Sequence, residues 1–131
     1  MKRLVIDVDN TLTLGDTSDY AKVAPNLEVI GTLRAYKELG FEIVLHTARN
    51  MRTHKSNVGR INAVTLPILT TWLEEHDVPY DEIWTGKPWC GEAGFYVDDK
   101  AIRPDEFSRM TYPEIRHLLG MSPLHTPDNE C

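Results

Sequence analysis

The sequence predicts an α/β fold in which helices cover both faces of a central parallel sheet. Short segments rich in Val, Ile and Leu alternate with longer segments whose apolar residues recur at helical spacing, and this alternation is typical of βαβ units. A length of 131 residues suits one domain with one core. We expect the folded domain to span residues 1–120, and residues 121–131, which hold two prolines and polar residues, to form a flexible tail.

The first half of the chain carries signals for two strands, a flap and a helix. Residues 3–8 open with a continuous aliphatic run, which is typical of a strand buried on both faces of a sheet. Residues 12–25 leave room for a hairpin-sized flap. Asn26 suits the N-cap of a helix that Gly40 ends. Residues 41–46 are again rich in Ile, Val and Leu, and predict the second strand.

The second half predicts two helices and two shorter strands. Residues 65–67 (Thr-Leu-Pro) resemble a helix start, because proline is favoured in the first helical turn. Residues 82–84 predict a short third strand, and residues 94–98 a fourth. A last helix is expected from about residue 113 to residue 119. Strands and helices in this order predict right-handed crossovers and one parallel sheet.

Charge and composition exclude several classes of function. A net charge of −6 argues against a nucleic-acid-binding surface. Apolar runs of only a few residues argue against a membrane span. The two cysteines make no disulfide framework, which favours a cytoplasmic location. The expected partner is therefore a small molecule.

One basic segment interrupts this acidic sequence. Residues 43–73 contain no Asp or Glu, yet they hold four bases: Arg49, Arg52, Lys55 and Arg60. Such a segment suits a small anionic ligand, and it equally suits a solvated basic loop.

Polar residues follow each predicted strand. Ligands of parallel α/β sheets bind beyond the carboxyl ends of the strands, so residues at these ends are candidates for one site. Alternate residues of an extended segment point the same way, which lets two acids spaced by two residues face one pocket. The candidates are Asp7 and Asp9 after the first strand, Thr47 after the second, Lys87 after the third, and Asp98 and Asp99 after the fourth.

This set of residues predicts a magnesium site that handles phosphate. Four carboxylates in one place repel each other and need a cation, and hard oxygen donors suit Mg²⁺ rather than Zn²⁺. The expected metal ligands are Asp7, Asp9, Asp98 and Asp99. A carboxylate held against a phosphoryl group can attack phosphorus, and a second acid can protonate the leaving oxygen. Thr47 and Lys87 would donate hydrogen bonds to the phosphoryl oxygens.

The run Asp7-Val8-Asp9-Asn10-Thr11, followed in order by Thr47, Lys87 and Asp98-Asp99, resembles the four motifs of the haloacid dehalogenase (HAD) superfamily. The resemblance covers residues 4 to about 100, and it implies a Rossmann-like three-layer sandwich. It also implies that Asp7 is the nucleophile, and that Asp9 is the general acid/base with its backbone carbonyl on the metal. Asp99 would bind the metal directly, and Asp98 would have an orienting role or bind the metal through water, although the two could exchange roles.

Smaller features point to a subclass of this superfamily. The segments between the motifs are too short for a cap domain, so we expect an open site, one that a second copy of the chain could close. Residues 47–52, 65–67 and 86–91 resemble small phosphatases of bacterial capsule and surface-polysaccharide biosynthesis. That resemblance implies a sugar or polyol phosphate as substrate. Its expected contacts are Thr47, Arg49, Asn50, Arg52, Lys55 and Lys87.

Two other functions fit the same residue types. A receiver-type signalling domain also combines clustered Asp, Thr and Lys with Mg²⁺, but it places its acid pair after the first strand and its Lys last. A catalytically silent phosphate-binding module would keep Thr47 and Lys87, yet it would not need Asp9 two residues after Asp7.

Overall fold

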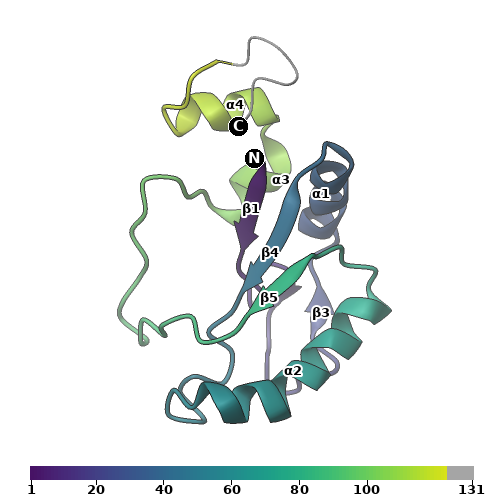
Figure 1. Ribbon diagram of the computed structural model, residues 1–131, viewed down its shortest axis with the longest axis vertical. Coiled ribbons are helices and arrows are strands. Elements are labelled where there is room, and N and C mark those ends of the chain that lie inside the picture. Colours follow the sequence, from purple (N-terminus) through teal and green to yellow (C-terminus); the bar gives the residue numbers. More distant parts are fainter. Residues whose placement is uncertain (124–131) are drawn as a thin grey trace.

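A computed structural model describes residues 1–123 and forms a small α/β protein around a parallel sheet (Figure 1). Three strands, β1 (Arg3–Ile6), β4 (Glu42–His46) and β5 (Glu82–Trp84), lie in the order β1-β4-β5. All neighbours in this sheet are parallel. The α/β class, the parallel sheet and the first three strand positions are therefore confirmed.

A small flap follows β1. Its base is the antiparallel pair β2 (Thr13–Leu14) and β3 (Ala24–Pro25). The buried indole of Trp72 donates a 2.9 Å hydrogen bond to the backbone carbonyl of Val23, which ties the base of the flap to a helix. The hairpin-sized flap is thus present.

The first helix, α1 (Leu27–Glu38), begins and ends where its local signals predict. The side chain of Asn26 accepts a hydrogen bond from the backbone N–H of Val29, which satisfies one of the free donors at the helix start. Gly40 follows the helix with φ +95°, a left-handed conformation that glycine adopts without strain.

The second helix, α2 (Val58–Glu75), begins earlier than predicted. Its N-cap is Asn57, whose side chain accepts from the backbone N–H of Arg60. Pro67 lies inside this helix, so the predicted start at residues 65–67 is wrong. Because this helix already has a capped first turn upstream, it tolerates the loss of the one backbone hydrogen bond that proline cannot donate.

The described part of the chain closes with two short helices that contact α1. The predicted last helix is present as α4 (Tyr112–Leu118), whereas α3 (Pro104–Arg109) was not predicted. Phe107 of α3 lies in the core, where its ring centroid is 5.0 Å from that of Tyr36. Most of the tail predicted to be flexible, residues 124–131, lies outside the described residues. None of the helices within residues 1–123 has the length and apolar character that a membrane span needs.

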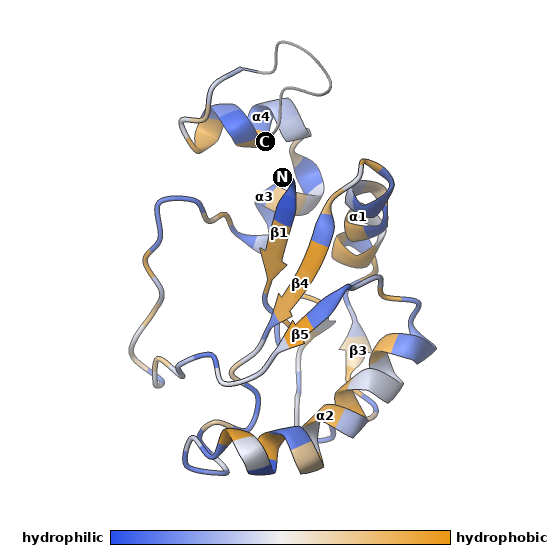
Figure 2. Ribbon diagram, in the orientation of Figure 1, coloured by the Kyte–Doolittle hydropathy of each residue, from blue (hydrophilic) through white to orange (hydrophobic). Residues whose placement is uncertain are grey.

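The main core cluster lies on one face of the sheet. Side chains of α1 and α2 share one core cluster with a set of strand residues that face the same way: Leu4, Ile6, Ile43, Leu45 and Ile83. Figure 2 shows the apolar stretches of β1 and β4. On the opposite face Val5 is 60% exposed and Trp84 is 54% exposed, whereas Val44 of the central strand is buried.

The predicted fourth strand does not form. Residues 94–98 belong to a long loop between β5 and α3 that runs out past β1 (Figure 1), and Val97 is 88% exposed. Local contacts hold this loop instead of sheet pairing. The hydroxyl of Tyr96 donates to the carbonyl of Pro88 at 2.5 Å. The backbone at Gly94 lies so close to Cys90 that an added Cβ would come within 2.1 Å of its carbonyl oxygen.

Candidate active site

A tight turn directly after β1 presents the two acids of the first motif. The carbonyl of Val8 accepts hydrogen bonds from the backbone N–H groups of residues 11, 12 and 13. Asn10 adopts φ 59° within this turn, a left-handed conformation that Asn tolerates better than most residues. The backbone therefore turns tightly around the Val8 carbonyl, and Asp7 and Asp9 lie at the carboxyl end of the sheet.

Asp7 lies beside a lysine that is 80 residues away in sequence. The Lys87 ammonium is 3.5 Å from Asp7 Oδ1, and the Thr11 hydroxyl donates to Asp7 Oδ2 at 3.2 Å. Lys87 is positioned by its own backbone N–H, which donates to the carbonyl of Thr47 at 3.1 Å. The ends of β1, β4 and β5 thus meet at one place, as the strand-end argument predicts.

Thr47 is an interior residue of this site. It is only 1% exposed, and its hydroxyl oxygen accepts a hydrogen bond from the backbone N–H of Arg49 at 2.9 Å. This contact shapes the loop that follows β4. It leaves the hydroxyl hydrogen free to donate, but the surface of the side chain is not open to solvent.

Arg49 is buried against Asp9 and does not lie at the rim. Its Nη2 donates to Asp9 Oδ1 at 2.7 Å and its Nε to Asp9 Oδ2 at 3.3 Å, and its side chain is 0% exposed. The guanidinium carbon lies 4.0 Å from the centroid of the Tyr20 ring, which belongs to the flap. The expected rim contact between Arg49 and substrate therefore does not fit its observed position.

The remaining expected contacts from this loop are Asn50, Arg52 and Lys55. Asn50 adopts φ 61°, and its side-chain oxygen Oδ1 accepts a hydrogen bond from the Thr65 hydroxyl at 2.6 Å. Arg52 is exposed and lies 3.2 Å from Glu92. Lys55 is likewise exposed. Of the expected substrate contacts, Arg52 and Lys55 are the ones open to solvent.

The acid pair Asp98 and Asp99 lies in an exposed turn that is not part of a strand end. The Asp98 carboxylate accepts from the backbone N–H of Lys100 at 2.9 Å, and this hydrogen bond lowers the pKa of Asp98. Within residues 1–123, no three His, Cys, Asp or Glu side chains are grouped closely enough to hold a metal ion. The four expected metal ligands are therefore not gathered in this arrangement.

Three aromatic neighbours of the site were not predicted from the sequence. Tyr20 covers Arg49, and the Tyr96 ring centroid lies 4.2 Å from the Lys87 ammonium. His46 directly precedes Thr47, which is the one signal that could have identified it. Burial lowers the pKa of His46, and the positive charge of Lys87 lowers it further.

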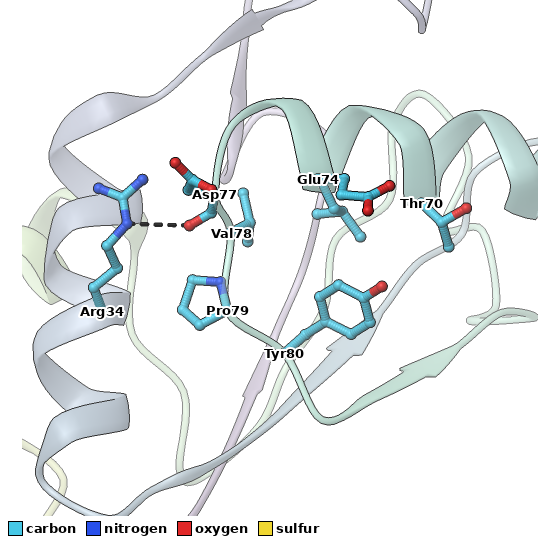
Figure 3. A pocket seen from close by; sticks show the side chains of 8 residues that line it. Arg34, Thr70, Glu74, Asp77, Val78, Pro79 and Tyr80 are labelled. Atoms are coloured by element: carbon cyan, nitrogen blue, oxygen red, sulfur yellow. Dashed lines mark hydrogen bonds between the residues drawn. The ribbon is translucent and has the colours of Figure 1, made fainter.

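A shallow hollow of about 540 Å³ lies elsewhere, where the end of α2 meets α1 (Figure 3). Tyr80 and Asp77 line it, and Arg34 donates to the backbone carbonyl of Asp77 at 3.1 Å. These residues precede β5, whereas Lys87 follows it. The hollow is therefore at the opposite end of the sheet from the candidate site.

Comparison with known proteins relates this chain to a solved structure. A crystal structure of an MCSG target from Vibrio cholerae is 60% identical in sequence, with a TM-score of 0.90. The match covers 92% of this chain and 98% of that chain. The two proteins belong to one family. No family model and no curated protein matches this chain. The likeness to the Vibrio cholerae protein extends over nearly the whole fold described above.

Proposed function

We propose that this protein is a phosphomonoester hydrolase that works through an aspartyl-phosphate on Asp7, as the resemblance to the HAD superfamily implies. The observation that supports this most is the meeting of Asp7, Asp9 and Lys87 at the carboxyl edge of the sheet, with the Lys87 ammonium 3.5 Å from Asp7. A carboxylate beside an ammonium group suits attack on a phosphoryl group, because the ammonium can neutralise charge on the phosphoryl oxygens.

The proposed reaction has two steps. An Asp7 carboxylate oxygen attacks phosphorus while the bond from phosphorus to the leaving oxygen breaks, and Asp9 gives its proton to that oxygen. Asp9 then takes a proton from water, whose oxygen attacks phosphorus and releases inorganic phosphate and the free Asp7 carboxylate. In both steps Lys87 donates to the phosphoryl oxygens, where negative charge accumulates.

The charges near Asp7 favour a divalent cation. Asp7 is paired with Lys87 and Asp9 with Arg49, and even with Asp9 protonated for the first step a phosphate dianion would leave excess negative charge. Mg²⁺, when bound, would supply the missing positive charge.

The donor types suit Mg²⁺, but their present positions do not complete a site. Asp7 and the backbone carbonyl of Asp9 would be joined by Asp98 and Asp99 only if residues 94–99 approached β1. Two features favour that movement: β1 has a sheet neighbour on one side only, and Phe95 is 79% exposed although it is apolar. The proposed three-layer, capless HAD arrangement rests on the same movement.

For the substrate we propose a sugar or polyol phosphate, on the resemblance to capsule and surface-polysaccharide phosphatases. Exposed Arg52 and Lys55, which belong to the loop that follows Thr47, are suitable contacts for its hydroxyl or anionic groups. The short flap leaves the site open, which suits a large substrate or closure by a second copy of the chain. A cytoplasmic location is proposed from the low cysteine content.

A silent phosphate-binding module is the second candidate, and one observation favours it. The acid pair at residues 98–99 lies in an exposed turn and Thr47 is buried, so the complete catalytic set is not assembled. A receiver-like domain would share the aspartyl-phosphate but would not release phosphate steadily.

Steady hydrolysis of p-nitrophenyl phosphate separates these candidates. We expect turnover of this substrate to require Mg²⁺ and to stop with EDTA. The variant Asp9→Asn should lose turnover of substrates with poor leaving groups. Phosphate binding without turnover, measured by calorimetry, would support the silent module. A single burst without further release would support the receiver-like reading.

A further inference from the structure

The contact between Arg49 and Asp9 is the most enclosed charged contact at the candidate site. Two nitrogens of the guanidinium donate to the two oxygens of one carboxylate, at 2.7 and 3.3 Å. This fork geometry fixes the carboxylate in its plane as well as in position, which a lysine could not do. The Asp9 side chain is 24% exposed and that of Arg49 is 0% exposed, so solvent reaches the carboxylate but not the guanidinium.

The surroundings of Arg49 indicate that its position serves Asp9. Its Nη1 is buried and has no hydrogen-bond partner. Buried donors are normally hydrogen-bonded, because an unpaired buried donor costs about 1–3 kcal/mol. Here the side chain meets Asp9 at its edge and the flap residue Tyr20 on its face, at 4.0 Å. These two contacts fix the guanidinium, and its third donor group is left unpaired.

We propose that Arg49 is a positioning residue for Asp9 and that Tyr20 of the flap holds Arg49 in place. The proposal rests on the proposed function, in which Asp9 transfers the proton to the leaving group. It deepens that function by assigning the flap a role in the chemical step. In this assignment Arg49 acts through the orientation of Asp9 and not through contact with the substrate.

The first test compares two substrates in the full-length protein. The quantity compared is kcat/KM, which reports only the steps up to release of the leaving group and so leaves out the hydrolysis step that both substrates share. For Arg49→Ala we expect kcat/KM on an alkyl phosphate, whose leaving group needs a proton, to fall by about 10²-fold. On p-nitrophenyl phosphate, whose leaving group does not, kcat/KM is expected to fall by less than about fivefold. Arg49→Lys keeps the charge without the fork, so we expect it to lose at least about tenfold on the alkyl phosphate.

The second test is a double-mutant comparison. If Arg49 acts through Asp9, the variant Asp9→Asn/Arg49→Ala should be no slower than Asp9→Asn alone. In the same way, Tyr20→Ala should reduce alkyl phosphate turnover several-fold and add nothing to Arg49→Ala. Tyr20→Phe keeps the ring over the guanidinium and should match the parent. Arg60→Ala, which removes an exposed arginine of the same acid-free segment, is the matched control and should leave all rates unchanged.

Each outcome has a distinct meaning. A parent without turnover overturns the proposed function, and the inference with it. An active parent whose Arg49 and Asp9 substitutions multiply in their effects overturns the inference alone. Equal losses on both substrates for Arg49→Lys would also overturn it. Thermal unfolding of each variant identifies any that fail to fold, and Arg49→Lys then decides in place of Arg49→Ala.

Discussion

Replacing Asp7 with Asn should abolish turnover and leave the fold intact. The substitution keeps the shape and the acceptor for the Thr11 hydroxyl, but it removes the nucleophilic carboxylate and the ion pair with Lys87. The side chain of Asp7 is 36% exposed, so solvent screens that pair, and its loss should cost at most about 1 kcal/mol. This corresponds to a fall of no more than about 5 °C in Tm. Turnover should fall by at least about 10³-fold, because no other nucleophile replaces the carboxylate.

The assay for this prediction is release of p-nitrophenol with Mg²⁺, measured together with thermal unfolding. Asp105→Asn is a matched control, since Asp105 is an exposed residue in the first turn of α3, outside the candidate site. It should retain the parent turnover. An Asp7→Asn protein that folds normally and keeps more than about a tenth of the parent turnover would remove Asp7 from the mechanism.

Three further predictions test the flap, the rim and the charge of the site. Trp72→Phe removes the hydrogen bond to the Val23 carbonyl and should lower the free energy of unfolding by about 1–3 kcal/mol; an unchanged urea midpoint would contradict this. Arg52→Ala should raise KM for a sugar phosphate several-fold, with less effect at high salt, and leave aryl phosphate unaffected; no change in KM would make Arg52 a solvated residue. Because burial and Lys87 lower the pKa of His46 in the folded protein, His46 binds a proton more readily in the unfolded chain than in the folded one. Stability should therefore fall as pH drops from about 6.5 through the lower folded-state pKa. NMR titration of His46 in Lys87→Met should find a raised pKa, and an unmoved one would contradict the electrostatic part.

Elements that depend on local signals were predictable from the sequence. The aliphatic run of residues 41–46 became β4, and Asn26 caps α1 as expected. The start of α2 was not predicted because Pro67 is a stronger sequence signal for a helix start than Asn57, although both residues are compatible with one helix. The N-cap at Asn57 is also a local signal, because Asn is a favoured N-cap residue.

Features that depend on tertiary contacts were not predictable in the same way. Residues 94–98 have the composition of a strand, but composition does not determine which edge of a sheet a strand pairs with. Contacts of Tyr96 with Pro88 and Lys87 hold these residues in a loop instead. Val5 belongs to an aliphatic run, yet it is exposed on the face of the sheet opposite the main core cluster.

The candidate site also contains one contact that the order of elements predicts and one that depends on tertiary contacts alone. Asp7 and Lys87 meet because the ends of parallel strands share one edge, which the order of elements predicts. The burial of Arg49 depends on Asp9 and on Tyr20, which lie 40 and 29 residues away in sequence. No periodicity or spacing encodes that contact, so the sequence suggested a rim residue where the structure has an interior one.

Chemical trapping of the intermediate tests the central proposal most directly. An acyl phosphate is reduced by borohydride to an alcohol, which would convert phosphorylated Asp7 to homoserine. With p-nitrophenyl phosphate and Mg²⁺, peptide mass spectrometry should find this product at position 7 in the parent and none in Asp7→Asn. Steady release of phosphate without a reduced residue at position 7, or with the product at another aspartate, would contradict the account.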